Sequence, residues 1–386
     1  MKFGSPEAIR FAKGIFLTAI FIGLLCLPTL DSIFKFDHAP IPNEKRLPAP
    51  FPTYTGMSGM RDFTASLNQF FDDHFGFRRR LIRASNHWKR QLFRTPALDI
   101  ILGEDGWLFT TSNAMLDHYL GFKRFSQKDL EAWQQLLEKR QKWLAARGCE
   151  YLLVLAPDKQ SVYPEYFPAT LPRSSKPGKF AQLVDHMKAH STVPVLDLTE
   201  PLVEAKKCGA PLYLKIDTHW NYLGGFLAYQ AVINALSNEV PDLKPLPLSA
   251  FDRKPTIQPM GDLGPILGDT GGMETQQVVF SAIAPLKDLK ADVVLERLPK
   301  QWVKETDPRL TKNESRHGKA IMFHDSFGCS WEPFLGYHFN EVLYIWQYQF
   351  DPAFLEREKP QVVISEIVER MFNQADPREL MIKDGL

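Results

Sequence analysis

Residues 320–328 read AIMFHDSFG, an apolar run that leads into a histidine, an aspartate and a serine. A short apolar run of this kind predicts a strand that is buried on both faces of a sheet. Helical patterns such as Leu223–Leu236 separate several such runs. This alternation predicts an α/β fold, a three-layer α/β/α sandwich around a mostly parallel sheet. The other runs of this type are Tyr151–Ala156, Val193–Leu198, Glu341–Trp346 and Val362–Val368.

The overall composition excludes several classes of protein. The chain has 386 residues with 46 Lys and Arg against 45 Asp and Glu, and its formal net charge is +1. A dedicated nucleic-acid binder normally carries a basic excess, so we expect no nucleic-acid partner. The hydrophobic content of 44% is enough to fill a core and excludes global disorder. Four cysteines are too few for a disulfide-built scaffold, and no CxxC pair indicates a zinc or iron–sulfur site.

The N-terminus differs from this average composition. Gly14–Leu30 is a run of 17 residues without a charge, close to the lower limit for a membrane-spanning helix. Lys2, Arg10 and Lys13 precede it, and the positive-inside rule then leaves the N-terminus in the cytoplasm and exports the rest. No small-x-small cleavage pattern follows the run. We therefore favour an uncleaved signal anchor over its two alternatives, a cleaved signal peptide and a buried core helix.

Further along, the chain divides into a linker and one large domain. Five prolines between residues 35 and 53 favour a semi-rigid, extended spacer. A long helical pattern then runs from Arg61 to about Arg94. The predicted regions are a cytoplasmic stub with a signal-anchor helix at 1–34, a Pro-rich linker at 35–60 and the folded domain at 61–386.

Residues 240–315 interrupt the rhythm of strands and helices with many prolines and glycines. Two candidate strands lie inside this interval, Gln277–Ala282 and Asp292–Leu295. We interpret the interval as an insertion that contributes to the rim of an active site.

Ser326 follows the strand at 320–323 almost directly. In a parallel sheet the turn after a strand lies at the carboxyl edge, where α/β proteins bind their ligands. A serine on a sharp strand-to-helix turn is exposed there, and amides of the helix N-terminus can stabilise an oxyanion. Gly328 relieves crowding at such a turn, although His324 stands where G-x-S-x-G has its first glycine. The alternative is that Ser326 or Asp325 is an ordinary helix N-cap.

A candidate base and a carboxylate lie two residues apart in KIDTHWNYLG, residues 215–224. A nucleophilic serine needs an imidazole base and a carboxylate that fixes the imidazole tautomer. Asp217 and His219 meet if the segment bends at Thr218. Two other interpretations stay open, an aspartate-capped turn beside a core-packed histidine and a pair of metal ligands. A metal would need a third ligand, and no residue nearby has convincing spacing.

A third polar segment, APDKQSVYPEYFP at 156–168, follows the strand at 151 and so belongs to the same sheet edge. Lys159, Tyr163 and Glu165 are candidate pocket residues, and the alternative is a proline-rich turn that packs its own tyrosines. The glycines of residues 261–272 match neither G-x-G-x-x-G nor a P-loop. We infer no nucleotide site, no metal and no other cofactor.

Taken together, these segments resemble the alginate O-acetyltransferases of the AlgJ/AlgX type, which have an SGNH-hydrolase-like domain. The resemblance runs from about Phe70 to Arg370. The motifs that carry it are Phe71–Arg78 (FDDHFGFR), Leu102–Phe109 (LGEDGWLF), Pro157–Pro168, Asp217–Trp220, Asp325–Gly328 and Glu366–Arg370 (EIVER).

The resemblance implies a Ser-His-Asp triad with Ser326 as nucleophile, His219 as base and Asp217 as the residue that orients the base. The motif order is permuted relative to SGNH hydrolases, because the Asp-x-His segment precedes the serine. It also implies transfer of acetyl groups to hydroxyls of a secreted polysaccharide through an acetyl-serine intermediate. The residues expected to bind substrate are Lys159, Tyr163 and Arg370.

The resemblance also implies partners and a location. A membrane-bound acyltransferase would supply the acetyl group, and other components of polysaccharide export would be present. The chain ends too early for the carbohydrate-binding module of the AlgX type, so we expect the membrane-anchored AlgJ type. Its helix would lie in the bacterial inner membrane and its catalytic domain in the periplasm. Two other functions stay open, a polysaccharide deacetylase or acetylesterase with the same triad, and a non-catalytic subunit of an export complex.

Overall fold

The computed structural model describes residues 6–34, 36, 49–53, 60–78, 80, 81, 84, 100–171, 173–240, 243–258, 261–264, 277–285, 294–297 and 308–385. By internal contacts the chain forms two compact units. They are Met1–Ala97 with Pro265–Met273, and Leu98–Gly264 with Glu274–Leu386. The unit that contains the sheet therefore begins further along the chain than the predicted residue 61. Most of the predicted linker at 35–60 lies outside the described residues.

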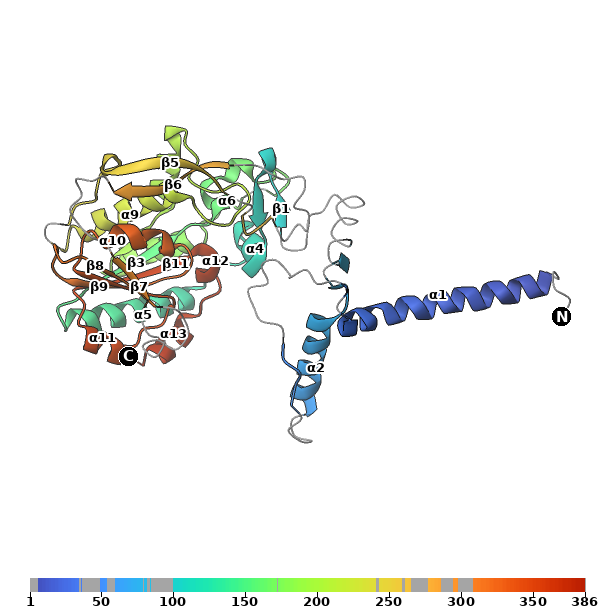
Figure 1. Cartoon of the computed structure of the whole chain (residues 1–386). Helices are drawn as coiled ribbons and strands as arrows, with labels where there is room; N and C mark the ends of the chain where they lie inside the picture. Colours follow the sequence, from blue (N-terminus) through green and yellow to red (C-terminus); the bar gives the residue numbers. More distant parts are fainter. Residues whose placement is uncertain are drawn as a thin grey trace. The chain divides into compact units, whose positions relative to one another are not determined.

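The described part of the first unit contains two helices, α1 (Pro6–Phe34) and α2 (Met60–His74) (Figure 1). The apolar part of α1, Phe11–Ser32, has 22 residues, and no residue of its most apolar stretch is buried. At 1.5 Å per residue it is roughly 33 Å long, enough to cross a hydrocarbon core of about 30 Å. This exposure contradicts the alternative of a buried core helix. The helix predicted from Arg61 to about Arg94 is not continuous, because α2 ends at His74 and residues 75–77 form a turn. Residues 85–94 of that prediction lie outside the described residues.

The second unit is built around a seven-stranded sheet with the order β4-β3-β11-β9-β10-β8-β7. The strands β4, β3, β11, β9 and β10 are parallel, and β8 runs antiparallel to both of its neighbours. The bounds of the seven are β3 (Glu150–Ala156), β4 (Val195–Asp197), β7 (Val294–Arg297), β8 (Arg309–Lys312), β9 (Lys319–Phe323), β10 (Glu341–Ile345) and β11 (Val362–Val368). The five predicted buried strands are confirmed as the parallel part of this sheet.

Two smaller antiparallel pairs accompany the sheet, β1 (Ile100–Leu102) with β2 (Leu108–Thr110), and β5 (Phe251–Gln258) with β6 (Gln277–Pro285). The interval 240–315 thus supplies the β5–β6 pair and also β7 and β8, which extend the main sheet. It is therefore joined to the sheet rather than only inserted beside it. The helices of this unit are α4 (Met115–Tyr119), α5 (Gln127–Ala145), α6 (Lys159–Val162), α7 (Lys179–His190), α8 (Thr199–Ala205), α9 (Tyr222–Leu236), α10 (Glu332–Leu335), α11 (Pro352–Glu358), α12 (Glu369–Phe372) and α13 (Pro377–Asp384).

Both faces of the sheet are buried, as the pattern of β3 shows. Leu152 and Val154 belong to one hydrophobic cluster, which includes residues of α9 and α10. Leu153 and Leu155 point the other way, into a cluster with residues of α5, α7, α11 and α13. Successive side chains of a strand face opposite sides, so helices cover both faces (Figure 1). The predicted three-layer sandwich is confirmed.

Hydrogen bonds at the N-termini of helices fix several segments of this unit, including the one that leads into α9. Ser126 and Asp129 form the capping box that begins α5. α9 begins at Asn221, whose side chain accepts the Gly224 N–H. The segment just before Asn221 is held by a bridge between Tyr213 and Trp220.

Candidate active site

Ser326 lies in the turn between β9 and a short 3-10 helix, Gly328–Trp331. Asp325 holds this turn, since its Oδ1 accepts the Phe327 N–H at 2.9 Å. The 3-10 helix has Phe327 as its N-cap and no side-chain capping bond, so neither Asp325 nor Ser326 is an ordinary helix cap, and the serine hydroxyl is available for another partner. Among the residues that the structure describes, no acceptor pairs with the backbone N–H of Ser326. That N–H is a candidate donor for an oxyanion at the carboxyl edge of the sheet.

Gly328 gives the turn the room it needs. A Cβ at this position would lie 2.5 Å from Cε of Met322 and 2.6 Å from Cβ of His324. Both contacts are far shorter than van der Waals distance, so a larger residue would displace the strand side chains or the turn. His324 is itself buried, and its Nδ1 donates to the carbonyl of Asp325 at 2.7 Å. His324, which stands where G-x-S-x-G has its first glycine, is therefore accommodated as a buried residue of the core.

His219 connects Ser326 to a carboxylate. Its Nε2 lies 2.7 Å from Ser326 Oγ, and its Nδ1 lies 2.7 Å from Asp217 Oδ1. An ionised carboxylate only accepts, so Nδ1 carries the proton and Nε2 accepts from the serine hydroxyl. The same Oδ1 accepts the backbone N–H of His219 at 2.9 Å. The structure thus brings Asp217, His219 and Ser326 into one hydrogen-bonded chain, with the bend at Thr218 that the spacing requires.

Asp217 is held in its charged form. Burial alone would raise its pKa, but hydrogen bonds and the attraction of His219 outweigh burial and lower the pKa below its ordinary value. The backbone N–H of Asp262 adds to this by donating to Asp217 Oδ2 at 3.0 Å. The carboxylate therefore stays ionised over the whole range in which an imidazole base works.

Asp262 is a residue that the sequence did not single out. Its two carboxylate oxygens accept from Thr218, one from the backbone N–H at 2.8 Å and the other from the hydroxyl at 2.7 Å. Its Oδ2 also lies 3.7 Å from His219 Nδ1. Gly261 allows this approach, because a Cβ there would lie 2.5 Å from Cβ of Asp217. The His219 segment is thus clamped between two carboxylates.

One atom each from Asp217, His219 and Asp262 lies within 4.8 Å of the others, a grouping that could ligate a cation. A cation at this place would compete for His219 Nδ1, which already donates to Asp217. The same atoms therefore serve either a metal or the orientation of the imidazole. The hydrogen bond to Ser326 on the far side of the ring fits the second use.

Lys159 lies beneath the His219 segment and not on the surface of a pocket. Its side chain is buried, and its Nζ donates to the carbonyls of Leu214 and Lys215 at 2.9 Å each and of Asp217 at 2.6 Å. Burial lowers the pKa of Lys159 to about 7, although nearby carboxylates including Asp217 and Asp262 oppose this. We expected Lys159 to contact substrate. Its role is structural instead, because all three N–H donors of the ammonium are used inside the fold.

Tyr163 and Arg370 are also committed to internal partners. The hydroxyl of Tyr163 accepts the Leu212 N–H at 2.9 Å, and the residue is 6% exposed. Arg370 forms an ion pair with Asp158, and its guanidinium lies 5.1 Å from the ring centre of Phe327. Tyr163 therefore has a structural role inside the fold, which differs from the substrate contact that we expected. Arg370 is half-buried beside Phe327, and its contact with substrate stays a prediction.

The EIVER segment supports the turn at Ser326. Glu366 Oε2 accepts the Asp325 N–H at 3.0 Å, and the Val368 N–H donates to Asp325 Oδ2 at 2.8 Å. The hydroxyl of Tyr348 donates to the same Oδ2 at 2.7 Å. Burial and the nearby charge of Asp325 raise the pKa of Glu366 well above its ordinary value. The turn therefore rests on a buried polar network in which burial favours the uncharged form of Glu366.

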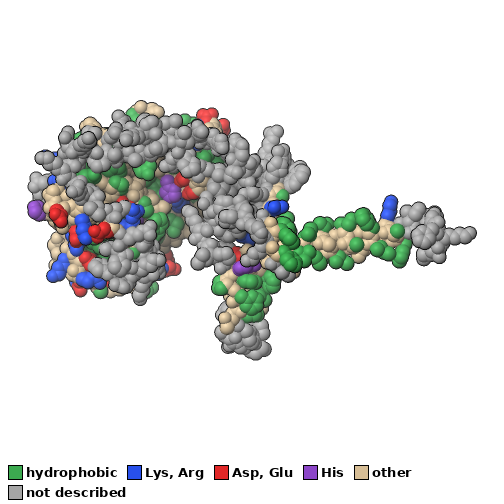
Figure 2. Space-filling view, viewed as in Figure 1, with side chains coloured by type: hydrophobic (Ala, Val, Ile, Leu, Met, Phe, Trp, Pro, Cys, Tyr) green, Lys and Arg blue, Asp and Glu red, His purple; other side chains and the backbone are tan. Residues whose placement is uncertain are grey.

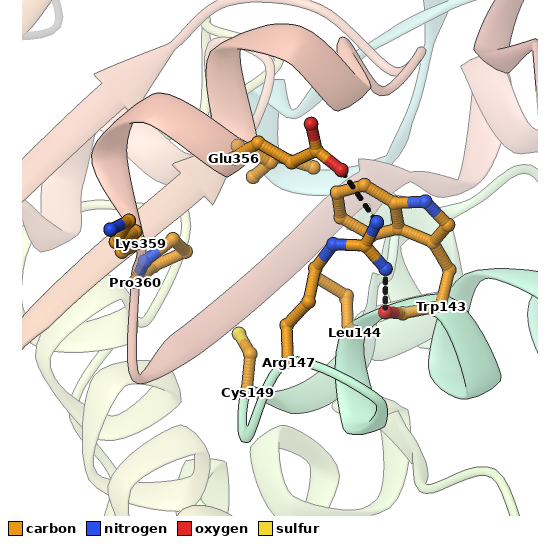
Figure 3. A pocket seen from close by; sticks show the side chains of 8 residues that line it. Trp143, Leu144, Arg147, Cys149, Glu356, Lys359 and Pro360 are labelled. Atoms are coloured by element: carbon orange, nitrogen blue, oxygen red, sulfur yellow. Dashed lines mark hydrogen bonds and ion pairs between the residues drawn. The ribbon is translucent and has the colours of Figure 1, made fainter.

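A separate cavity lies at the opposite edge of the sheet. Its volume is about 340 Å³, and it is formed where α5 leads into β3 and where α11 leads into β11 (Figure 3). Arg147 crosses it, paired with Glu356 at 2.5 Å and stacked on Trp143 at 3.7 Å from the ring centre. Because parallel strands begin at this edge and end at the other, the cavity is remote from Ser326. The cavity is lined by Trp143, Leu144, Arg147, Cys149, Leu355, Glu356, Lys359 and Pro360.

Comparison with known proteins finds one matching family model and several curated relatives. The family model described as SGNH hydrolase-like domain, acetyltransferase AlgX, matches residues 100–295, which include Asp217 and His219. A probable alginate O-acetylase AlgJ of Pseudomonas putida is 28% identical over 199 residues, 51% of this chain and 48% of that protein. The AlgJ of Pseudomonas aeruginosa is 31% identical over 134 residues, 34% of this chain and 32% of that protein. The chain thus spans about half the length, or less, of the curated relatives it matches.

Among solved structures, PatB1 of Bacillus cereus superposes with a TM-score of 0.54 at 13% sequence identity. The match covers 72% of this chain and 98% of PatB1. At this identity the likeness concerns the fold alone, and it agrees with the three-layer architecture described above.

Proposed function

This chain belongs to the family of the SGNH hydrolase-like acetyltransferase AlgX, and we propose that it transfers acetyl groups to hydroxyls of an exported, alginate-like polysaccharide. The curated relatives are named probable alginate O-acetylases AlgJ, and the apolar N-terminal helix fits the membrane-anchored type. Because the match covers 48% of the Pseudomonas putida relative, the acetylase activity and the substrate are carried over as parts of the proposal.

The observation that carries the proposal is the hydrogen-bonded chain from Asp217 through His219 to Ser326. Both contacts of the imidazole are 2.7 Å long, within the range at which a base takes a proton. If Ser326 were only a helix cap and His219 only a core residue, nothing would require their side chains to lie at hydrogen-bond distance. The arrangement is that of a nucleophile, a base and the carboxylate that orients the base.

In the proposed reaction, His219 Nε2 takes the proton of Ser326 while Oγ attacks the carbonyl carbon of an acetyl donor. The backbone N–H of Ser326 stabilises the tetrahedral oxyanion. The intermediate collapses, the bond to the donor's leaving oxygen breaks, and that oxygen takes the proton from the imidazolium. The products of this half-reaction are the deacetylated donor and acetyl-Ser326.

The second half-reaction runs in reverse order on a new partner. A sugar hydroxyl gives its proton to His219 and attacks the acetyl-serine carbonyl. Collapse of the second tetrahedral intermediate releases the acetylated sugar, and the serine oxygen recovers the proton from His219. Asp217 stabilises the imidazolium in both halves, and Asp262 adds a second negative charge at 3.7 Å from Nδ1.

The proposed partners rest on the similarity to the AlgX and AlgJ proteins. The acceptor is the polysaccharide, and we propose that a membrane-bound acyltransferase supplies the acetyl group next to other components of polysaccharide export. Lys2, Arg10 and Lys13 before the apolar helix favour a cytoplasmic N-terminus. The catalytic domain would then lie in the periplasm, tethered to the inner membrane by α1.

Mass spectrometry of the full chain after incubation with an activated acetyl ester tests the nucleophile. The parent should gain one acetyl group on the peptide that contains Ser326, and Ser326→Ala should gain none there. The matched control is Ser237→Ala, at the exposed end of α9, which should label like the parent. Acetylation that persists on that peptide in Ser326→Ala would remove the nucleophile and favour the non-catalytic alternative.

A second assay separates transfer from hydrolysis. The acetyl-enzyme is supplied with an alginate-type oligosaccharide, and acetylated sugar and free acetate are both measured. A transferase should yield mainly acetylated sugar. Acetate as the main product, unaffected by the oligosaccharide, would favour the esterase or deacetylase alternative.

A further inference from the structure

The turn after α2 is hydrogen-bonded to the end of α1. Asp31 Oδ2 accepts the Phe77 N–H at 2.7 Å, and Ser32 Oγ lies 2.9 Å from the carbonyl oxygen of His74. Asp31 is 6% exposed, so its carboxylate is covered by this turn and not by water. Chain segments about 45 residues apart are thus fastened to each other within the first unit.

Close packing fixes the same contact. A Cβ at Gly76 would lie 1.9 Å from the carbonyl oxygen of Pro28, so only glycine allows the two backbones to approach this far. Pro28 to Ser32 are the last residues of the apolar segment Phe11–Ser32. In the proposed membrane span these residues lie at the outer boundary of the hydrocarbon core. The turn at 74–77 must then lie at the same depth.

Large aromatic side chains are exposed around this turn. Phe71, in the last turn of α2, is 59% exposed, and Phe75, directly after this helix, is 49% exposed. Phe34 and Phe36, at and just after the end of α1, are exposed by 61% and 62%. Single exposed hydrophobic residues are ordinary, but Phe75 adjoins Gly76, which packs against Pro28 near the end of α1, where Phe34 and Phe36 are exposed as well. Figure 2 shows hydrophobic side chains along α1 and over α2.

We propose that α2 and the turn after it lie in the outer interface of the bilayer, with Phe71 and Phe75 inserted among the lipids. Interfacial helices carry Phe or Leu on the side that enters the boundary between headgroups and acyl chains. The inference rests on the proposed membrane span of α1. The membrane anchor then consists of two elements, α1 and α2 with the turn after it, because the lipid-facing surface of α1 continues into these phenylalanines. We call this two-part anchor the hook.

The hook also bears on processing of the N-terminus. Removal of α1 would take away the carboxylate that accepts the Phe77 N–H and the backbone against which Gly76 packs. A cleaved chain would therefore lose the partner of its own turn, which favours the uncleaved anchor.

Photo-crosslinking in vesicles tests the proposal. The full chain carries p-benzoylphenylalanine in place of Phe71 or Phe75, is reconstituted into phosphatidylcholine and phosphatidylglycerol vesicles and is irradiated, and lipid adducts are measured by mass spectrometry. The control position is Gln69, which is exposed on the same helix but about 200° around it from Phe71. A further probe replaces Leu24 in α1 and reports on the span itself.

We expect lipid adducts at 71 and 75 to exceed those at 69 by at least fivefold, with strong labelling at 24. Labelling at 24 with no excess at 71 and 75 would overturn the interfacial hook and leave the span intact. Adducts at 71 and 75 mainly to a second copy of the chain would make the patch a protein interface and also overturn it. Absence of lipid adducts at 24 would refute the span and this inference together.

Discussion

The charge of Asp262 should speed the reaction, and Asp262→Asn isolates that charge. The amide has the same shape and still offers an oxygen to Thr218, so the clamp on the His219 segment is largely kept. What is lost is a negative charge 3.7 Å from His219 Nδ1. The imidazole becomes positive only as Ser326 loses its proton, so the loss falls on the transition state more than on the resting enzyme.

The size of the effect follows from the distance. Two unit charges this far apart interact by about 1 kcal/mol in water and by about 4 kcal/mol at an effective dielectric constant near 20. The Asp262 side chain is 24% exposed, which places the site between these limits. We expect a loss of about 1–3 kcal/mol of transition-state stabilisation, or roughly 5- to 150-fold in kcat/KM.

The assay is the rate of acetyl-enzyme formation from an activated acetyl ester, measured from pH 5 to 9. The substitution also removes a charge that raises the pKa of Lys159, so the rates are compared on both sides of pH 7. The charges of Asp217 and Arg370 are unchanged. Glu314→Gln, an exposed carboxylate on the second unit, is the matched control and should behave as the parent.

A rate within twofold of the parent at every pH would refute this reasoning, because it would mean that the charge of Asp262 does not reach the imidazole.

Three further predictions concern residues around the same turn. Asp217→Asn should lower the rate of acetyl-enzyme formation by about 10⁴-fold while the chain stays folded by circular dichroism, because the imidazole loses the partner that fixes its tautomer; a loss under tenfold would contradict this. Burial lowers the pKa of Lys159 to about 7, so between pH 7 and 10 the unfolded chain binds more protons and stability from Lys159 rises with pH. The free energy of unfolding of the parent relative to Lys159→Met, from urea titrations, should therefore be about 2 kcal/mol more favourable at pH 9 than at pH 6, and a constant difference would count against it. Gly328→Ala should cost about 1–3 kcal/mol in thermal unfolding and slow acylation, because its Cβ would meet Met322 at 2.5 Å; a variant with the stability and rate of the parent would show that the turn has room.

Local patterns predicted the parallel strands and marked Ser326, Asp217 and His219 as candidates, and the resemblance to AlgJ and AlgX proteins joined the three residues into one set. Apolar runs bounded by turns mark buried strands, and parallel strands bring the turns that follow them to one edge. Ser326 and His219 are 107 residues apart, yet each stands directly after or before an element that the pattern recognises. The antiparallel strand β8 and the edge strand β7 were harder to predict, since four residues of mixed polarity do not identify a strand's partner.

Residues whose role depends on a distant contact could not be assigned correctly. Asp262 meets Asp217 across 45 residues of sequence, in an interval whose glycines indicated only a loop. Lys159 follows a strand, as a pocket residue would, but a lysine at a sheet edge can turn outward to substrate or inward to backbone carbonyls. Only the path of residues 214–217 decides between the two, and that path is not encoded in any local pattern.

Under the proposed function, the support of Ser326 by β11 has a consequence for the order in which the site forms during export. The turn is held by Glu366 and by the Val368 N–H, which come 41 and 43 residues after Asp325 in the chain. A polypeptide that crossed the membrane with its N-terminal part first would present the imidazole loop long before these residues emerged. The proposed nucleophile would therefore be positioned late, after nearly all of the sheet is in place, and a partly translocated chain would have no competent serine with which to consume activated acetyl groups.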